Sequence, residues 1–208
     1  TTVIKNSVFE NYTGDTFWEY ANYFSNDASG SIFANRDWTS PFSDYQSTII
    51  NINEVVRLTA DDPNLVNEHA MARIWRGWLF PQMTDAYGDI PYSQAAGSVD
   101  IVNVQPEYDT QQSIYADMLN ELKEAVASLS SDGSLASFGS ADLLYSGNVD
   151  NWIRLGNSLR LRLAIRVRYA DEALAQQHIS DVISQPLIDD NSQNALLMTI
   201  DGTDVNNV

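Results

Sequence analysis

The sequence has 208 residues, of which 44% are hydrophobic, and these values suit one globular domain rather than a disordered or membrane-spanning chain. No apolar run approaches the roughly 18 residues that a transmembrane helix needs, so we expect the chain as given to be soluble. A net charge of −17 repels phosphates, which disfavours nucleic acid as a partner. The sequence contains no cysteine, which excludes disulfides and thiolate metal sites, so any lipid-bearing cysteine would have to precede residue 1.

In the first third of the chain, apolar residues three and four positions apart predict two short helices, around Phe17–Phe24 and Ile49–Val56. The stretch between them, Ser25 to Pro41, is rich in Asn, Asp, Ser and Gly and is typical of a long loop. Loops of this length in compact domains are often functional. Trp18 and Tyr23 lie on the first helical face, and we expect them in the core.

A longer helix is expected in the second third. Its start is predicted at Asp61-Asp62-Pro63, where an aspartate can cap the helix and proline suits the first position. Pro81 is expected to kink the last turn. The end is predicted at Tyr87-Gly88, because glycine permits a left-handed cap and Pro91 prevents continuation. Trp75 and Trp78 fall within its apolar stripe, which assigns them to packing.

Three more helices are expected after a polar, extended stretch from Gly97 to Glu107. The first is capped by Asp109, with Gln112 three residues later, and ends near Ser130–Gly133. Its core stripe is Ile114, Met118, Leu122, Ala125, Val126 and Leu129. The second runs from Asp150 to about Tyr169, with Trp152, Leu155, Leu159 and Leu163 inward, and the third runs from Asp171 to Ser184, where Pro186 stops it. No strand is predicted, so the fold class is all-α, built from helical hairpins.

Several titratable residues could be considered as catalytic or metal-binding groups, but the sequence signal for each is weak. Asp85 and Asp89 could form an acid and base pair for glycoside hydrolysis, but Asp89 after a helix end is better explained by turn N–H bonds. His69 and His178 stand far apart without a ligand pattern, so both are expected to be structural or exposed, and zinc is not expected. The stretch 189–194 lacks the glycine and the closing glutamate of a calcium loop. We therefore predict no catalytic residue, no metal and no cofactor.

Five arginines follow one another in the 150–169 helix: Arg154, Arg160, Arg162, Arg166 and Arg168. They could form an anion cradle in an otherwise acidic chain. The stronger alternative is that their guanidinium groups donate hydrogen bonds to carboxylates and carbonyls between packed helices.

The loop around Arg36, Asp37 and Trp38 is the predicted ligand-binding site. A bound sugar needs an apolar platform beneath its C–H face and nearby polar groups for its hydroxyls. Trp38 can provide the platform, and Asp37 and Arg36 can bond the hydroxyls. The alternative for Trp38 is a place in the core.

Three segments in order resemble the SusD/RagB family of outer-membrane nutrient-binding lipoproteins. The most specific is Asp85-Ala86-Tyr87-Gly88-Asp89-Ile90-Pro91-Tyr92, which ends a Trp-rich helix. The others are Pro106–Tyr115 and the stretch from Asp142 to Arg166, which contains Trp152-Ile153-Arg154-Leu155-Gly156-Asn157. Together they cover most of the chain from about residue 60 to residue 184.

The resemblance implies tetratricopeptide-like helical hairpins with long irregular loops. It implies a cell-surface protein of the outer membrane, held there by a lipid anchor that the given chain lacks, and a SusC-like TonB-dependent transporter as partner. Members mostly bind oligosaccharides, some bind peptides, and none is expected to be an enzyme. Because members are typically more than twice as long, we expect residues 1–208 to be a single helical domain from the N-terminal portion of a longer chain.

Two other functions stay open. The chain could be a helical scaffold for contact with the transporter, with the ligand site in the remaining part of the protein. It could also be a glycosidase, which would require two carboxylates within roughly 5 to 10 Å of each other in a cleft.

Overall fold

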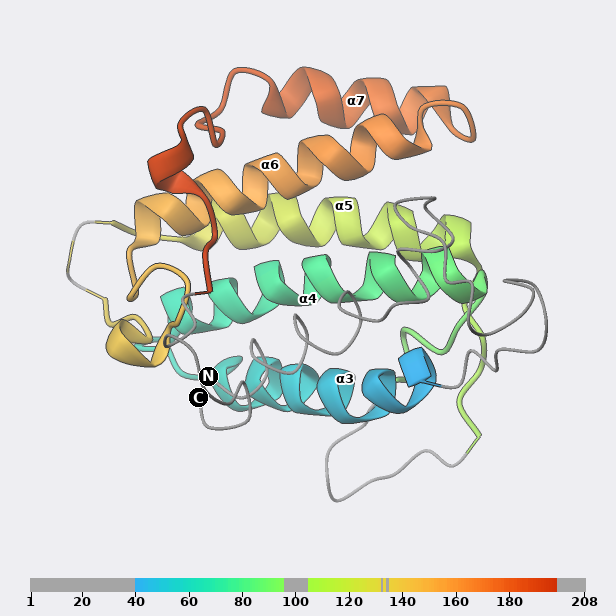
Figure 1. Ribbon diagram of the computed structural model, residues 1–208, viewed down its shortest axis with the longest axis horizontal. Coiled ribbons are helices and arrows are strands. Elements are labelled where there is room, and N and C mark those ends of the chain that lie inside the picture. Colours follow the sequence, from blue (N-terminus) through green and yellow to red (C-terminus); the bar gives the residue numbers. More distant parts are fainter. Residues whose placement is uncertain (1–39, 96–104, 132, 134, 198–208) are drawn as a thin grey trace, which may run out of the picture.

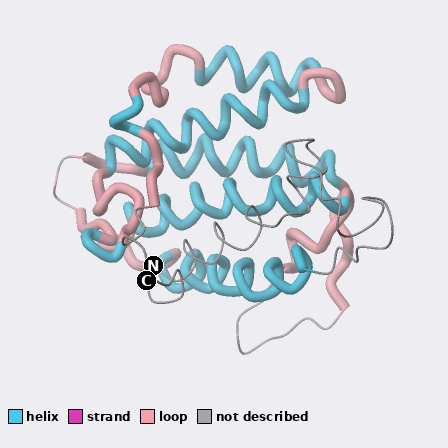
Figure 2. Tube along the Cα trace, in the orientation of Figure 1, coloured by secondary structure: helices cyan, strands magenta, loops and turns pink. Residues whose placement is uncertain are grey.

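The computed structural model describes residues 40–95, 105–131, 133 and 135–197, which form five α-helices and two short 3-10 helices. The α-helices are α3 (Ser40–Thr59), α4 (Val66–Tyr87), α5 (Gln111–Ser128), α6 (Val149–Val167) and α7 (Glu172–Val182). The 3-10 helices are η1 (Gly139–Ala141) and η2 (Asn191–Gln193). In this described part there is no strand, only one isolated bridge between Ile90 and Asp109, and Figure 2 shows helices joined by loops. None of these helices combines the length and the apolarity needed to span a bilayer.

The five α-helices lie side by side in chain order, and each runs antiparallel to the one before (Figure 1). Successive helices pack on each other, and α4 also contacts α6. The predicted all-α, tetratricopeptide-like architecture of helical hairpins is therefore confirmed. The expected helix around residues 17–24, with Trp18 and Tyr23, lies outside the described residues.

The apolar stripes predicted from the sequence form the core. Ile114, Met118, Leu122 and Ala125 of α5 are fully buried, and Val126 and Leu129 are partly buried at its edge. Trp152 of α6 is 2% exposed and meets the rings of Trp75 and Tyr145 edge-on, at 6.5 and 5.9 Å between centroids. Trp75 and Trp152 thus serve packing, as predicted, and Trp78 packs partly buried against the same core.

Two glycines set how closely the helices approach. A Cβ atom on Gly77 of α4 would lie 2.7 Å from Leu122 Cδ2 of α5, and one on Gly156 of α6 would collide with Val126 of α5. Because neither position tolerates a methyl group without movement, glycine allows α5 to pack tightly against both neighbours.

The start of α4 differs from the prediction. The helix begins at Val66, and Leu65 at its N-cap contributes no side-chain hydrogen bond. Asp62 instead accepts hydrogen bonds from the backbone N–H and the side-chain amide of Asn64, both at 2.8 Å. The Asp-Pro pair therefore forms the turn between α3 and α4, because the aspartate bonds locally rather than to a helix end. At the other end, Gly88 caps the helix as predicted and has a positive φ of 76°, but its ψ of −122° is not that of the expected left-handed helical conformation.

The cap of α5 also differs from the prediction. Thr110, not Asp109, is the N-cap, and its side chain accepts a hydrogen bond from the Ser113 N–H. Asp109 is held one residue earlier by its bridge to Ile90 and bonds the backbone of residues 92–93 instead. The last helix lies within its predicted range of Asp171 to Ser184: Asp171 caps α7, and the helix ends at Val182, two residues before the predicted end.

Most arginines of α6 join neighbouring elements, as the packing alternative predicted. Arg154 donates to the Leu187 carbonyl at 2.7 Å, and Arg160 bonds His178 and Asp181 of α7. Arg166 reaches Asp85 of α4 at 2.8 Å. His178 is fully buried, which confirms its structural role.

Candidate ligand-binding pocket

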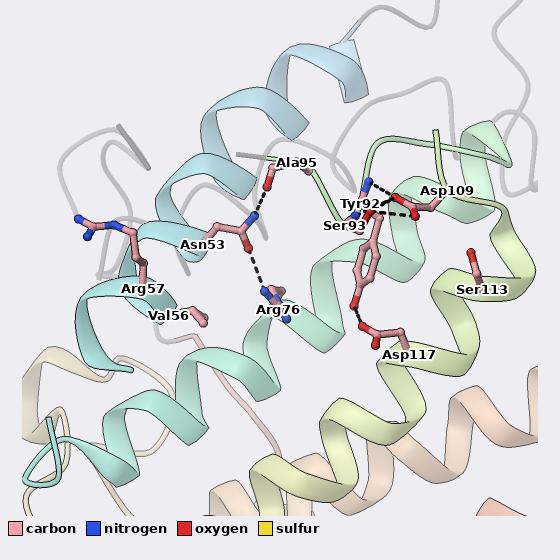
Figure 3. Close-up of a pocket in the computed structure, with 10 residues that line it drawn as sticks. All are labelled: Asn53, Val56, Arg57, Arg76, Tyr92, Ser93, Ala95, Asp109, Ser113 and Asp117. Carbon is pink, nitrogen blue, oxygen red and sulfur yellow. Dashed lines mark hydrogen bonds between the residues drawn. The ribbon is translucent and has the colours of Figure 1, made fainter. Parts of the chain in front are cut away.

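A pocket of about 660 Å³ opens between α3, α4, α5 and the turn that follows α4. Its lining residues are Asn53, Val56, Arg57, Arg76, Tyr92, Ser93, Ala95, Asp109, Ser113 and Asp117. Figure 3 shows Asn53 and Arg57 on the α3 side, Ser113 and Asp117 on the α5 side, and Arg76 and Tyr92 between them. The volume falls within the range of small-molecule sites, which is roughly 300–1,000 Å³.

Asp109 positions the turn that carries Tyr92. Its Oδ2 atom accepts hydrogen bonds from the backbone N–H groups of Tyr92 at 3.1 Å and Ser93 at 2.8 Å. The Ser93 hydroxyl donates to the same carboxylate. These hydrogen bonds to the charged form keep the pKa of Asp109 below its usual value, although desolvation opposes them. The ring of Tyr92 packs edge-on against Phe80 at 4.6 Å between centroids, so both its backbone and its ring are fixed.

An ion-pair network lies beneath the pocket. Glu121 of α5, which is 5% exposed, accepts hydrogen bonds from Arg73 Nε at 3.3 Å and from Arg76 Nε at 3.1 Å. Arg76 Nη2 bonds the second oxygen of the same carboxylate, so this pair has two contacts. Arg73 also reaches Glu124 at 2.9 Å. Desolvation tends to lower the pKa of Arg76, but the nearby carboxylates, Glu121 first, outweigh it and raise that pKa above its usual value.

Asn53 connects α3 to this network. Its side-chain amide donates to the Ala95 carbonyl at 3.0 Å, and its Oδ1 atom lies 3.5 Å from Arg76 Nη1. One side chain therefore bridges the α3 wall, the turn after Tyr92 and the guanidinium between them (Figure 3).

Tyr92 presents a protonated phenol to the pocket. Its hydroxyl donates to Asp117 Oδ2 at 2.5 Å and lies 3.5 Å from Glu121 Oε2. Burial, followed by the negative charge of Glu121, raises the pKa of Tyr92 well above its usual value. The phenol therefore stays a hydrogen-bond donor at any physiological pH.

This arrangement suits a ligand with many hydroxyl groups. Amide, hydroxyl and carboxylate groups face the pocket together with the apolar Val56 and Ala95. Because neighbouring side chains already hold these polar groups in place, a ligand would not have to order them.

The sequence pointed to other residues for the site. Arg36, Asp37 and Trp38 lie outside the described residues, so their role stays a prediction. Asp85 and Asp89 have different structural partners: Asp85 accepts from the Tyr115 hydroxyl at 2.6 Å and pairs with Arg166, whereas Asp89 accepts from the Gln111 N–H at 2.9 Å. Asp89 therefore stabilises the start of α5, the structural role predicted for it, although the N–H belongs to the next helix rather than to its own turn.

The pocket residues were missed, although the sequence holds a signal for them. Arg73 and Arg76 are three residues apart on one helix, and Glu121 and Glu124 are three residues apart on the next. Residues three apart share a helix face, so matching pairs of opposite charge on adjacent helices predict a cross-helix network.

Comparison with known proteins identifies the family. The model of a SusD-like family, described as starch-binding and associating with the outer membrane, matches residues 5–208. The chain belongs to the SusD-like family. No curated protein matches the sequence significantly.

Solved SusD homologues share both sequence and fold with this SusD-like chain. A homologue from Parabacteroides distasonis is 32% identical over 86% of this chain and 33% of its own, with a TM-score of 0.68. A chitin-binding protein is 30% identical over 78% of this chain and 35% of its own, with a TM-score of 0.70. A chitin-binding SusD homologue from Flavobacterium johnsoniae is 29% identical over 71% of this chain and 30% of its own, with a TM-score of 0.60.

The SusD-like chain spans about one third of the length of these solved structures. SusD-like proteins are binding proteins associated with the outer membrane, and binding of nutrient glycans holds for the family. Among the side chains that the structure describes, no three His, Cys, Asp or Glu residues meet in a group that could hold a metal ion.

Proposed function

We propose that this SusD-like protein captures oligosaccharides at the cell surface and delivers them to a SusC-like TonB-dependent transporter in the outer membrane, without breaking any bond. The observation that carries the proposal is the pocket beside Tyr92, whose volume of about 660 Å³ and preset polar groups suit a short stretch of a glycan chain. The family match across residues 5–208 supports the same function.

In the proposed mechanism, the ligand lies along the α3–α5 opening. The Asn53 amide, the Ser113 hydroxyl and the Asp117 carboxylate bond its hydroxyl groups, and Tyr92 fixes the position of Asp117. We further propose that Trp38 supplies a stacking platform for the sugar ring, with Asp37 and Arg36 bonding neighbouring hydroxyls. Capture followed by transfer requires modest affinity, which a solvent-open site lined by both polar and apolar groups provides.

Chitin oligosaccharides are the first ligands to test, because two of the solved relatives are chitin-binding proteins. Calorimetric titration with hexamers of N-acetylglucosamine, cellulose and starch, beside a set of peptides, compares the glycan and peptide alternatives directly. Asn53→Ala should weaken binding of the preferred ligand about tenfold, through lost hydrogen bonds. The matched control is Asn120→Ala, an exposed amide of α5 that bonds only its own helix and should leave affinity unchanged.

The same titration separates this proposal from its rivals. Binding by the full-length protein but not by residues 1–208 would assign the described helices to scaffolding. Release of reducing ends from a bound oligosaccharide would instead show a glycosidase. Preference for peptides over all glycans would identify a peptide-binding member of the family.

A further inference from the structure

The cations that line the pocket are already neutralised. Arg57 pairs with Glu54 through two contacts, at 2.7 and 2.6 Å. Arg76 pairs with Glu121, which also accepts from Arg73, and Arg73 pairs with Glu124. Neither Arg57 nor Arg76, the two described arginines of the pocket wall, is therefore left to attract an anionic ligand.

Two carboxylates of the wall have no such partner. Within the described part of the protein, neither Asp109 nor Asp117 has a cation within 4.0 Å. Asp109 uses its oxygens to hold the backbone of Tyr92 and Ser93. Asp117 bonds the Tyr92 hydroxyl through Oδ2, and its Oδ1 atom accepts no hydrogen bond from the residues that the structure describes. The described pocket wall and the network beneath it therefore contain three arginines and five carboxylates, so the local net charge is negative.

We infer that this pocket selects amine-bearing oligosaccharides, such as glucosamine oligomers, over their anionic counterparts, with Asp117 accepting the ligand ammonium. The inference rests on the proposed function of the pocket and names its substrate class. Asp117 is an exposed residue of α5 that lines the pocket, so an ammonium can approach its Oδ1 atom. A uronate or sulfate would meet two carboxylates that have no cationic partner, in a chain whose net charge is −17, and no unpaired arginine of the described pocket wall would compensate.

An organic ammonium fits Asp117 better than a metal ion does. Calcium takes six to eight oxygen ligands, whereas no group of three metal-ligating side chains occurs among the described residues. An ammonium needs only separate acceptors for its three N–H donors. The second oxygen of Asp117 provides one, and Ser113 lies one helical turn away on the same wall.

The test compares three hexamers whose sugars carry a positive, a neutral and a negative group: glucosamine, N-acetylglucosamine and galacturonic acid. Each is titrated calorimetrically at slightly acid pH, where the amines are protonated, in low and in high salt. At low salt, the glucosamine hexamer should bind about fivefold more tightly than the N-acetylated one. This ratio of affinities corresponds to the free energy that one solvent-exposed ion pair contributes. High salt should reduce this ratio, and the galacturonic acid hexamer should bind most weakly.

Variants separate the pocket from the overall charge of the protein. Asp117→Asn keeps an acceptor for Tyr92 and should abolish the ratio between the first two hexamers. Asp150→Asn removes the same charge from the exposed first turn of α6 and should leave the ratio unchanged. Asp117→Ser removes the charge with a smaller side chain whose hydroxyl can still accept from Tyr92, and it should abolish the ratio as well, which provides a second check should Asp117→Asn unfold.

Several results would overturn the inference. One is equal affinity for the glucosamine and N-acetylglucosamine hexamers, and another is tightest binding of the galacturonic acid hexamer. The affinity ratio between the first two hexamers would also contradict the inference if it persisted in Asp117→Asn or fell as much in Asp150→Asn as in Asp117→Asn. Equal binding contradicts the substrate class alone. Failure of every glycan hexamer to bind contradicts the proposed function itself.

Discussion

The Glu121 carboxylate of α5 holds the Arg76 guanidinium of α4 through two contacts, and this pair forms the base of the ligand pocket. Glu121 is 5% exposed, whereas Glu124, one turn later on the same helix, is exposed. Both carboxylates also bond Arg73. The two glutamates therefore form a matched pair that differs mainly in burial.

Glu121→Leu should lower the free energy of unfolding by about 3 kcal/mol, because it leaves two partly buried arginines without their main acceptor. Glu124→Leu should change stability by less than about 1 kcal/mol, as expected for a solvent-exposed pair. Urea denaturation of both variants measures the difference. Equal losses of unfolding free energy in the two variants would show that the buried Glu121 pair contributes no more to stability than the exposed Glu124 pair.

The close approach of α5 and α6 predicts that Gly156→Ala is destabilising, even though alanine favours a helix by about 1 kcal/mol over glycine. The added methyl group would collide with Val126 and come within 3.1 Å of Ile74 Cδ1. We expect a net loss of about 1–2 kcal/mol in thermal or urea unfolding, since overpacking outweighs propensity. Val126→Ala removes the obstacle, so the double variant should be more stable than the sum of the two single changes. A single variant as stable as the wild type would contradict the packing.

Sequence reasoning predicted the helices well because their signals are local. The stripe from Ile114 to Ala125 repeats at helical spacing, and all of its members are buried. The two wrong caps share a cause. Asp62 bonds Asn64 in a turn, and Asp109 bonds the backbone at Tyr92, so each aspartate found a better partner than the helix it precedes. Local patterns cannot decide between such partners when one of them depends on tertiary contact.

The pocket was harder to foresee for the same reason. Tyr92 and Asp117 are 25 residues apart in sequence, and Asn53 and Ala95 are 42 apart. These contacts form only when α3, α4 and α5 are stacked. The predicted site at Trp38 came from composition instead, because an aromatic residue in a polar loop is a local signal.

The pH dependence of stability should reflect His178. Its Nδ1 atom accepts a hydrogen bond from Arg160 at 2.9 Å, so the folded state favours the neutral ring. Burial, then the charges of Arg160 and Lys123, lower the pKa of His178 below 6.5, and Asp181 opposes them only in part. The unfolded chain thus binds more protons below about pH 6.5, and this contribution to stability, complete above that pH, is lost as the pH falls towards the folded pKa.

Urea unfolding measured from about pH 7 to pH 5 should show this loss, with a slope of at most about 1.4 kcal/mol per pH unit from one histidine. His178→Gln should be less stable at neutral pH but should show a shallower decline. His69, whose pKa is also lowered by burial, remains in both proteins and serves as a common background. An unchanged decline in the variant would exclude His178 as its source.

Trp38→Ala should weaken oligosaccharide binding by up to about tenfold if the residue stacks on a sugar ring, while the unfolding midpoint stays within a few degrees. Tyr169→Ala is the control, because this residue is 88% exposed just after α6 and is not among the residues that line the pocket. Calorimetry and thermal unfolding on the two variants give both readouts. A large loss of stability in Trp38→Ala would place this side chain in the core instead.

Solution NMR tests most directly whether the pocket beside Tyr92 holds the ligand. Addition of the best-binding oligosaccharide to labelled protein should shift the Asn53 side-chain amide and the backbone signals of Tyr92, Ser93 and Ser113 most strongly, with saturable dependence on concentration. Saturable shifts confined to residues outside the pocket, with these signals unchanged, would contradict the account.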